Sequence, residues 1–263
     1  MIALLTDFGV RDHYAAAMKG VILGICPDVT LVDISHDVPP HDVLAGALEL
    51  AASYQYFPSG TIFLVVVDPG VGSARRGIAA DASDYRFVAP DNGVLSLVED
   101  GHPLKRVVEL TERRYARPTV SRTFEGRDRF APAAAWLAKG VDLGALGRSA
   151  GPLHRLDVPK AAVESGSGTL AGEVLRVDRF GNLITNIDRR TFDGLVSAGG
   201  RPFEVHAGGH QVSKVVSTYA DATPGEICAL FGSTDHLEIA VNGASAAALL
   251  NLGRGAPVRV VIA

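Results

Sequence analysis

Short apolar runs alternate with segments of helical periodicity along the first part of the chain. The runs at residues 2–6, 30–35 and 61–67 are rich in β-branched residues and predict buried strands. Residues 14–25 and 42–56 lie between them and carry apolar side chains at helical spacing. Because strands that alternate with helices form βαβ units, we expect an α/β domain with a mainly parallel sheet.

Two more strand-length runs and two more helical segments extend this pattern to about residue 150. The strands are expected at residues 77–82 and 85–89, and the helices at 93–99 and 130–139. Between residues 149 and 168 the chain is rich in Gly, Pro, Ser and charged residues, which is the composition of a linker. We therefore expect an α/β domain over residues 1–155, a linker over 156–164 and a second domain over 165–263.

Strand-length runs with mostly alternating apolar and polar residues fill the rest of the chain. A period of two residues is typical of a strand that has one face in a core and the other in solvent. We expect the second domain to be smaller and all-β, a barrel-like fold or a sandwich, with strands at residues 169–178, 182–187, 203–207, 211–216, 227–231, 236–241 and 258–262.

Composition narrows the class of partner. The 263-residue chain has a formal net charge of −4 and no basic stripe, which disfavours nucleic acid and favours a small molecule. Cys26 and Cys228 lie in apolar segments and predict two buried thiols rather than a disulfide or a metal site. The N-terminus lacks the basic start of a signal peptide, and no apolar run is long enough to span a bilayer. We expect a cytoplasmic protein that contacts neither nucleic acid nor membrane.

The candidate chemistry is concentrated on the turn after the 61–67 run. Asp68 follows this run directly, and Arg75 comes after a segment that contains Gly70 and Gly72. Ligands of α/β proteins bind at the carboxyl ends of the strands, and glycines there let the backbone approach a substrate closely. A plain turn with an exposed ion pair would give the same sequence, so the motif alone leaves both interpretations open.

Two further acids belong to the same argument. Asp7 follows the first strand, and its carboxylate could accept hydrogen bonds from both hydroxyls of a ribose or cap the next helix. Glu125 lies in the charged segment 123–128. This segment either begins the next helix with Asp128 as its cap or brings a second carboxylate toward Asp68.

Polar residues also cluster at strand ends in the second domain. Asp178, Phe180 and Asn182 combine an acid, an aromatic ring and an amide, although a tight turn explains this group as well. Ser233 and Asn242 flank a later strand and could offer polar groups to a ligand, but turns explain them equally well.

The His residues give little support for a metal site. The eight His residues show no pair at ligand spacing on a predicted helix, and no Cys lies near them. His36 and His41 with Asp33 and Asp42 could suggest a metal, but such clusters are more often solvated loops. We therefore expect neither a metal ion nor another cofactor.

Taken together, the motifs resemble one family, the S-adenosyl-L-methionine hydroxide adenosyltransferases, over nearly the whole chain. The matching segments are Thr6-Asp7-Phe8-Gly9, Met18-Lys19-Gly20, Asp68-Pro-Gly-Val-Gly with Arg75-Arg76, Pro90-Asp91-Asn92-Gly93, Thr123-Phe-X-Gly-Arg-Asp128, Phe180-Gly-Asn182 and Glu238-Ile-Ala-Val-Asn242. The resemblance implies an N-terminal α/β domain, a C-terminal β-barrel and a homotrimer. It also implies a site between the N-terminal domain of one subunit and the C-terminal domain of a neighbour.

The resemblance assigns roles to individual residues. Asp68 and Arg75 match two members of the family's catalytic triad. Glu125 stands where the family usually has His, so it either takes over the third catalytic role or pairs with Arg122 or Arg127. Together with the polar groups at the strand ends, the resemblance also assigns substrate-binding residues. Asp7 would bind the ribose, Asp178 and Asn182 the methionine part and the adenine, and Ser233 the methionine carboxylate. Phe124, Phe180 and Asn242 complete the set.

The implied reaction is hydrolysis of S-adenosylmethionine at the ribose C5′, giving adenosine and L-methionine. The related fluorinase has Tyr at the position of Asp68, Thr at Val71 and Ser at Gly126, and it has an inserted loop that this chain lacks. Two carboxylates at Asp68 and Glu125 would repel a halide, which also disfavours a chlorinase. The remaining alternatives are a chlorinase-like S-adenosylmethionine-halide adenosyltransferase, a metal-dependent nucleotide phosphatase and a non-catalytic protein that binds S-adenosylmethionine or a nucleoside.

Overall fold

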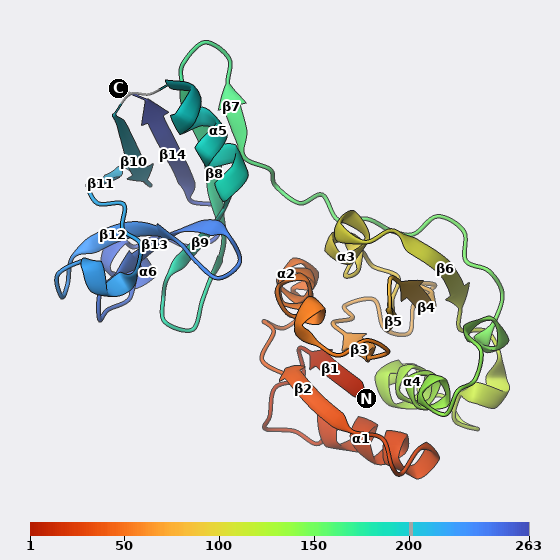
Figure 1. Ribbon diagram of the computed structural model, residues 1–263. Coiled ribbons are helices and arrows are strands. Elements are labelled where there is room, and N and C mark those ends of the chain that lie inside the picture. The colour runs from red at the N-terminus through yellow and green to blue at the C-terminus, as the bar shows by residue number, and fades with distance from the viewer. Residues whose placement is uncertain (200–201, 263) are drawn as a thin grey trace. The chain divides into compact units, whose positions relative to one another are not determined.

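The computed structural model describes residues 1–199 and 202–262, and it divides the chain into two compact units, Met1–Asp157 and Val158–Ala263 (Figure 1). Each unit has its own sheet and its own hydrophobic core. Within the described ranges, no helix has the length and apolar character needed to cross a membrane.

The first unit contains a six-stranded mixed sheet in the order β2-β1-β3-β5-β4-β6. The pairs β1–β2, β1–β3 and β3–β5 are parallel, whereas β4 is antiparallel to both of its neighbours. The prediction of a mainly parallel sheet is therefore confirmed, with β4 as the reversed strand. The strands are β1 (Ile2–Thr6), β2 (Leu31–Ser35), β3 (Ile62–Val66), β4 (Gly77–Ala82), β5 (Tyr85–Pro90) and β6 (Leu104–Glu109).

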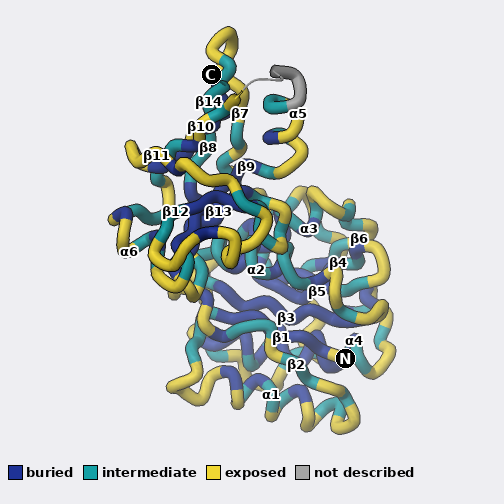
Figure 2. Tube along the Cα trace, turned by 60° about the vertical axis from the view of Figure 1, so that its left-hand side comes forward, coloured by how far each residue is buried: buried dark blue, intermediate teal, exposed yellow. Residues whose placement is uncertain are grey.

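Helices cover both faces of this sheet, because successive residues of a buried strand point to opposite sides. Ile2 and Leu4 face a core shared with α1 (Tyr14–Ile25) and α4 (Ala131–Ala138), and Ala3 and Leu5 face a second core. The second core is closed by α2 (Val43–Ser53) and α3 (Ser96–Gly101). Figure 2 shows the central strands as a buried, dark blue band.

The strand order places the candidate site. From β1 the chain crosses to β2 on one side, and the later strand β3 pairs with the other side of β1. This reversal of direction is a topological switch point, where the carboxyl ends of two neighbouring strands open into a crevice. Thr6 and Val66 are paired in register at these ends, so Asp7 and Asp68 follow adjacent strands.

The second unit is built on an eight-stranded antiparallel sheet in the order β11-β10-β14-β8-β9-β13-β12, with β7 beside β8. Residues after β11 reach the other edge, where the Val216 amide donates to Ala229 O at 2.9 Å. This contact nearly closes the sheet, as the barrel-like prediction requires. The strands are β7 (Ala162–Glu164), β8 (Thr169–Val177), β9 (Leu183–Asp188), β10 (Phe203–Ala207), β11 (His210–Val212), β12 (Ile227–Phe231), β13 (His236–Val241) and β14 (Pro257–Ile262).

Several elements differ from the expectations. The second unit is not purely β, because α5 (Arg189–Gly199) follows β9 and α6 (Ala246–Leu250) begins at Ser245, whose Oγ accepts from the Ala248 amide. The strand expected at 211–216 ends at Val212, where the chain leaves β10 and turns to β12. β6 and β7 were not expected as strands, and β7 lies in the range assigned to the linker. Single helical turns occur at 54–56, 113–115, 143–146 and 219–221, and a π-helix at Gly126–Phe130.

Candidate active site

The loop from β3 to β4 presents Asp68 and Arg75 on the same side. Ser73 shapes this loop, since its hydroxyl donates to Gly70 O at 2.6 Å and accepts from the Arg75 amide at 3.2 Å. Gly72 has φ 76° and lies so close to Arg122 that an added Cβ would be 2.3 Å from the Arg122 carbonyl oxygen. Only glycine fits this position, because both the left-handed backbone and the space exclude a side chain.

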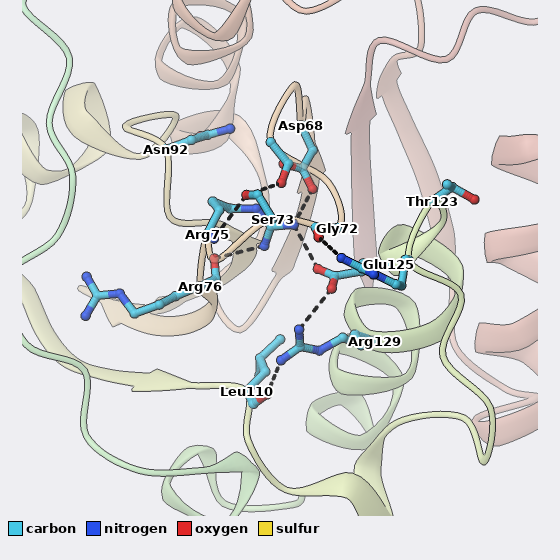
Figure 3. A network of polar contacts seen from close by, with 12 residues as sticks. Asp68, Gly72, Ser73, Arg75, Arg76, Asn92, Leu110, Thr123, Glu125 and Arg129 are labelled. Atoms are coloured by element: carbon cyan, nitrogen blue, oxygen red, sulfur yellow. Dashed lines mark hydrogen bonds and ion pairs between the residues drawn. The ribbon is translucent and has the colours of Figure 1, made fainter.

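Arg75 is held between two carboxylates (Figure 3). Its Nη2 lies 2.5 Å from Asp68 Oδ2 and 2.8 Å from Glu125 Oε2, and its Nη1 donates to Arg76 O at 2.9 Å. The guanidinium also lies over the Phe130 ring, with its carbon 5.3 Å from the ring centroid. The predicted approach of Glu125 to Asp68 is therefore found in the structure, through a shared arginine.

Glu125 comes from the residue before the π-helix. Its Oε1 accepts from Arg129 Nη1 at 3.1 Å, so each of its oxygens contacts a different arginine. The alternative pairing with Arg122 or Arg127 is wrong. Arg122 donates to the Gly72 carbonyl, and Arg127 forms two hydrogen bonds with Asp128.

The network is buried, which changes the acidity of Asp68. The side chains of Asp68, Arg75 and Glu125 are 5%, 8% and 11% exposed. Burial raises the pKa of the Asp68 carboxyl, Arg75 opposes the shift, and the charge of Glu125 adds to it, so the pKa lies above its usual value. Asp68 Oδ1 is buried and has no hydrogen-bond partner among the described residues. A buried oxygen without a protein donor is typical of a group that acts on a substrate or holds water.

Asp7 does not cap the following helix. Its Oδ2 accepts from the His41 amide at 2.8 Å, whereas α1 begins after His13. Phe124 lies in an aromatic group with Phe8 and Tyr14, whose ring centroids are 5.9 Å and 5.2 Å from its own. Asp7 thus lies in the loop that follows β1, and Phe124 lies in the segment that carries Glu125 and packs against Phe8 of that loop.

The His36 region forms a polar chain. His36 Nδ1 lies 2.8 Å from Thr6 Oγ1, and His36 Nε2 lies 3.1 Å from Asp33 Oδ1. The other carboxylate oxygen of Asp33 pairs with Lys19. Across the residues that the structure describes, no three His, Cys, Asp or Glu side chains are grouped so that they could hold a metal ion.

A cleft in the second unit gathers four of its five predicted residues. Asp178, Phe180, Asn182 and Ser233 line this cavity of about 1000 Å³. Asn242 does not line it, since its side-chain amide donates to Ala222 O at 2.7 Å in a neighbouring turn. Phe180 is 77% exposed, so its ring is free to pack on a ligand.

Asp178 also builds the turn that the sequence allowed. Its Oδ1 accepts from the Phe180 and Asn182 amides at 2.9 Å and 2.8 Å, and its Oδ2 accepts from Asn182 Nδ2 at 2.9 Å. Gly181 in this turn has φ 86°. These contacts hold the Asn182 side chain in one orientation. Asp178 therefore both forms the turn and positions Asn182, one of the predicted substrate-binding residues.

Glu238 and Tyr219 of the same cleft were not predicted as individual site residues. The Tyr219 hydroxyl donates to Glu238 Oε2 at 2.8 Å, and burial raises the pKa of the Glu238 carboxyl, an effect that this hydroxyl opposes. Alternation along β13 predicts which face residue 238 occupies, but it does not reveal a partner that lies 19 positions away.

Comparison with known proteins places this geometry in a family. The profile of the SAM hydroxide adenosyltransferase N-terminal domain matches residues 2–147, and that of the C-terminal domain matches residues 172–259. The chain belongs to the SAM hydroxide adenosyltransferase family. The resemblance drawn from the motifs is thereby confirmed, and the loop with Asp68 and Arg75 lies within the matched N-terminal domain.

Relatives of this adenosyltransferase-family chain include hydrolases and a halogenase. It is 40% identical over 262 residues to (R)-S-adenosyl-L-methionine hydrolase from Salinispora tropica, covering 98% of this chain and 97% of that one. It is 31% identical to fluorinase from Actinoplanes sp., covering 99% and 97%. A crystal structure of an uncharacterized conserved protein from Thermotoga maritima superposes with a TM-score of 0.92 at 36% identity, covering 99% and 100%.

Proposed function

We propose that this protein hydrolyses S-adenosyl-L-methionine at the ribose C5′ and releases adenosine and L-methionine. The observation that carries the proposal is the buried network in which Arg75 contacts Asp68 and Glu125 while Asp68 Oδ1 has no partner among the described residues. The relative with 40% identity carries the name of a hydrolase of this substrate, whereas the fluorinase is less similar at 31% identity.

The reaction needs a nucleophile more than it needs an acid. The leaving group is a neutral thioether that departs from a sulfonium, so it requires no proton. Deprotonating free water at neutral pH means lowering a pKa of about 15.7 by about 9 units, which costs about 12 kcal/mol. One guanidinium at about 4 Å supplies about 4 kcal/mol at an effective dielectric of about 20. Arg75 alone therefore cannot generate hydroxide.

Concerted proton transfer resolves this shortfall. Water attacks C5′ in line with the departing sulfur and passes a proton to Asp68, which acts as general base. Arg75 orients the water and stabilises negative charge that develops on its oxygen. Glu125 fixes Arg75 from the other side and takes the place that the family usually gives to His. The raised pKa of Asp68 suits this role, because a stronger base accepts the proton more readily.

Substrate binding is assigned to residues of both units. Asp7 accepts from the ribose hydroxyls, and Ser233 donates to the methionine carboxylate. Asp178 and Asn182 bind the methionine part and the adenine, and Phe124, Phe180 and Asn242 complete the set. The support for the second-unit assignments is the common cleft that four of these residues line. No cofactor takes part in this scheme.

Assembly and location extend the same proposal. We expect a cytoplasmic homotrimer whose sites lie between subunits, as the family resemblance implies. Sedimentation velocity combined with activity measured across a dilution series tests this expectation. Full activity from a monomeric species would contradict an intersubunit site.

Product analysis tests the reaction itself. Purified protein incubated with S-adenosylmethionine in ¹⁸O-labelled water should release methionine and adenosine that carries the label at the 5′ oxygen, as chromatography with mass detection would show. Incubation with excess chloride or fluoride should give no halogenated adenosine, because the two carboxylates disfavour a bound halide. Stoichiometric binding without product would instead support a non-catalytic protein, and activity lost on chelation would support the metal-dependent phosphatase.

A further inference from the structure

Arg129 joins the catalytic network without belonging to any of the motifs quoted above. Its Nη1 donates to Glu125 Oε1 at 3.1 Å, and its Nη2 donates to the Leu110 carbonyl oxygen at 2.6 Å (Figure 3). The side chain is 25% exposed, and the residue lies four positions after Glu125. The guanidinium thus bridges the carboxylate to the backbone at Leu110, the first residue after β6.

The charges of the network balance only when Arg129 is counted. Asp68 and Glu125 are two buried acids, and Arg75 is the single cation between them. Unpaired charge in a buried place is costly, so a network of two acids and one cation would favour protonation of an acid. Arg129 supplies the second cation, so that two arginines face the two acids.

Arg129 also limits how Glu125 can bind Arg75. A carboxylate without other partners often binds a guanidinium in a bidentate manner, through both of its oxygens. Here Oε1 of Glu125 is bound to Arg129, so only Oε2 contacts Arg75. The same Nη2 of Arg75 therefore remains within 2.5 Å of Asp68 Oδ2.

We propose that Arg129 is a positioning residue that holds one oxygen of Glu125 so that Arg75 keeps its contact with Asp68. The inference rests on the proposed function, because it concerns how the catalytic group of that reaction is held. Arg129 touches neither Arg75 nor Asp68 in any hydrogen bond of the described residues, and it acts on them through Glu125.

The other charged groups nearby are bound to other partners or line a neighbouring cleft. Arg127 is bound to Asp128, and Arg122 donates to Gly72 O. A cleft beside Arg129 is lined by further charged side chains from the segment after β6, namely Glu112, Arg113, Arg114 and Arg117. The groups that face Glu125 within hydrogen-bond distance are thus Arg75 and Arg129.

A set of substitutions separates positioning from simple stabilisation. Turnover against pH would be measured for wild type, Arg129→Met, Glu125→Gln and the double variant. Loss of the cation should raise the pKa of Asp68. In Arg129→Met, the acid limb of the curve of turnover against pH should therefore move to higher pH by about 0.5–1 unit. It should also lower turnover about tenfold with KM nearly unchanged. In the double variant the acid limb should return toward its wild-type position, because the negative charge of Glu125 and the positive charge of Arg129 are removed together.

Two controls keep the test decisive. Arg106→Met removes an exposed arginine that pairs with Asp142 and Asp81, and it should leave both the limb and turnover unchanged. Arg129→Lys retains the charge but cannot reach two acceptors in the same fork, so it should keep the limb and lose turnover severalfold. Wild-type turnover in Arg129→Lys, or a wild-type limb and rate in folded Arg129→Met, would overturn the inference.

A structural readout covers the case in which the proposed reaction itself fails. If wild type releases no adenosine, this result contradicts the proposed function but does not test the positioning role of Arg129. A crystal structure of Arg129→Met then decides the positioning role: Glu125 should turn to bind Arg75 with both oxygens and displace it from Asp68. An unchanged Arg75–Asp68 contact in that variant would refute the inference regardless of activity.

Discussion

Replacing Asp68 with Asn tests the central assignment with the least change of shape. The amide oxygen can still accept from Arg75 Nη2, and Arg75 remains anchored by Glu125 at 2.8 Å. The amide nitrogen takes the position of Oδ1, which has no partner among the described residues. The substitution therefore presents a donor to the attacking water where the carboxylate presents an acceptor.

The expected loss follows from that reversal. A positioned general base contributes about 10²- to 10⁴-fold to rate, which corresponds to about 2.7–5.4 kcal/mol of activation free energy. Because Arg75 stays in place, we expect the loss to appear in turnover, with KM for S-adenosylmethionine changed little. Adenosine release under saturating substrate measures this directly. Turnover in Asp68→Asn within a few fold of wild type would refute the role of Asp68 as base.

Stability gives an independent check on the same residue. The folded-state pKa of Asp68 is raised, so its contribution to stability is fully present below the unfolded pKa and is lost as pH rises through the folded pKa. Asn cannot ionise. In thermal unfolding, the stability of Asp68→Asn relative to wild type should therefore fall as the pH is lowered, because only wild type gains stability by protonation of Asp68. Asp81, whose half-buried side chain pairs with Arg86 and Arg106, offers a control, because Asp81→Asn leaves the buried network of Asp68 unchanged. A stability difference between the two proteins that does not change with pH would contradict the raised pKa of Asp68.

Three further outcomes are expected. Glu125→Gln should move the acid limb of turnover to lower pH, because it removes a charge that raises the pKa of Asp68, and an unchanged limb and rate would take Glu125 off the catalytic list. Asp178→Asn should raise KM about tenfold while kcat stays close to wild type, since Asn182 Nδ2 loses its acceptor, and an unchanged KM would limit Asp178 to its turn. Dialysis against a chelator should leave turnover intact, because the described residues contain no group suited to a metal ion, and lost activity restored by a divalent cation would exclude the proposed mechanism.

Local pattern was sufficient for elements with a strong period and clear ends. The bounds expected for residues 2–6, 14–25 and 77–82 coincide with β1, α1 and β4. In the second unit the same is true of β10, β12 and β13. β6 was missed because it is an edge strand with charged residues, and such strands lack the apolar run that marks a buried one. α5 was missed because polar residues dominate it and its start depends on Asp188, whose carboxylate accepts from the Thr191 amide.

The candidate site divides in the same way. Asp68 and Arg75 lie seven positions apart on one turn, so sequence spacing alone placed them together. Glu125 is 50 positions from Arg75, and its contact depends on how the π-helix packs against the β3–β4 loop. A motif can indicate that such a residue matters. It cannot identify which nearby arginine will bind it: the sequence offered Arg122 or Arg127 as one alternative, whereas Glu125 binds Arg75 and Arg129.

The resemblance implies a His where this chain has Glu125, and the pairing of Glu125 with Arg129 gives that difference a physical meaning. An imidazole can be neutral, whereas an ionised carboxylate beside buried Asp68 adds a negative charge that must be compensated. Arg129 provides that compensation from the next turn of the same helical segment and fixes one Glu125 oxygen away from Arg75. Glu125→His alone would leave Arg129 with Leu110 O as its remaining hydrogen-bond partner among the described residues and place an imidazole between two cations. A return to the family residue should therefore be tolerated better when Arg129 is replaced by Met at the same time. Higher turnover in the single variant than in the double would show that the two positions are not coupled.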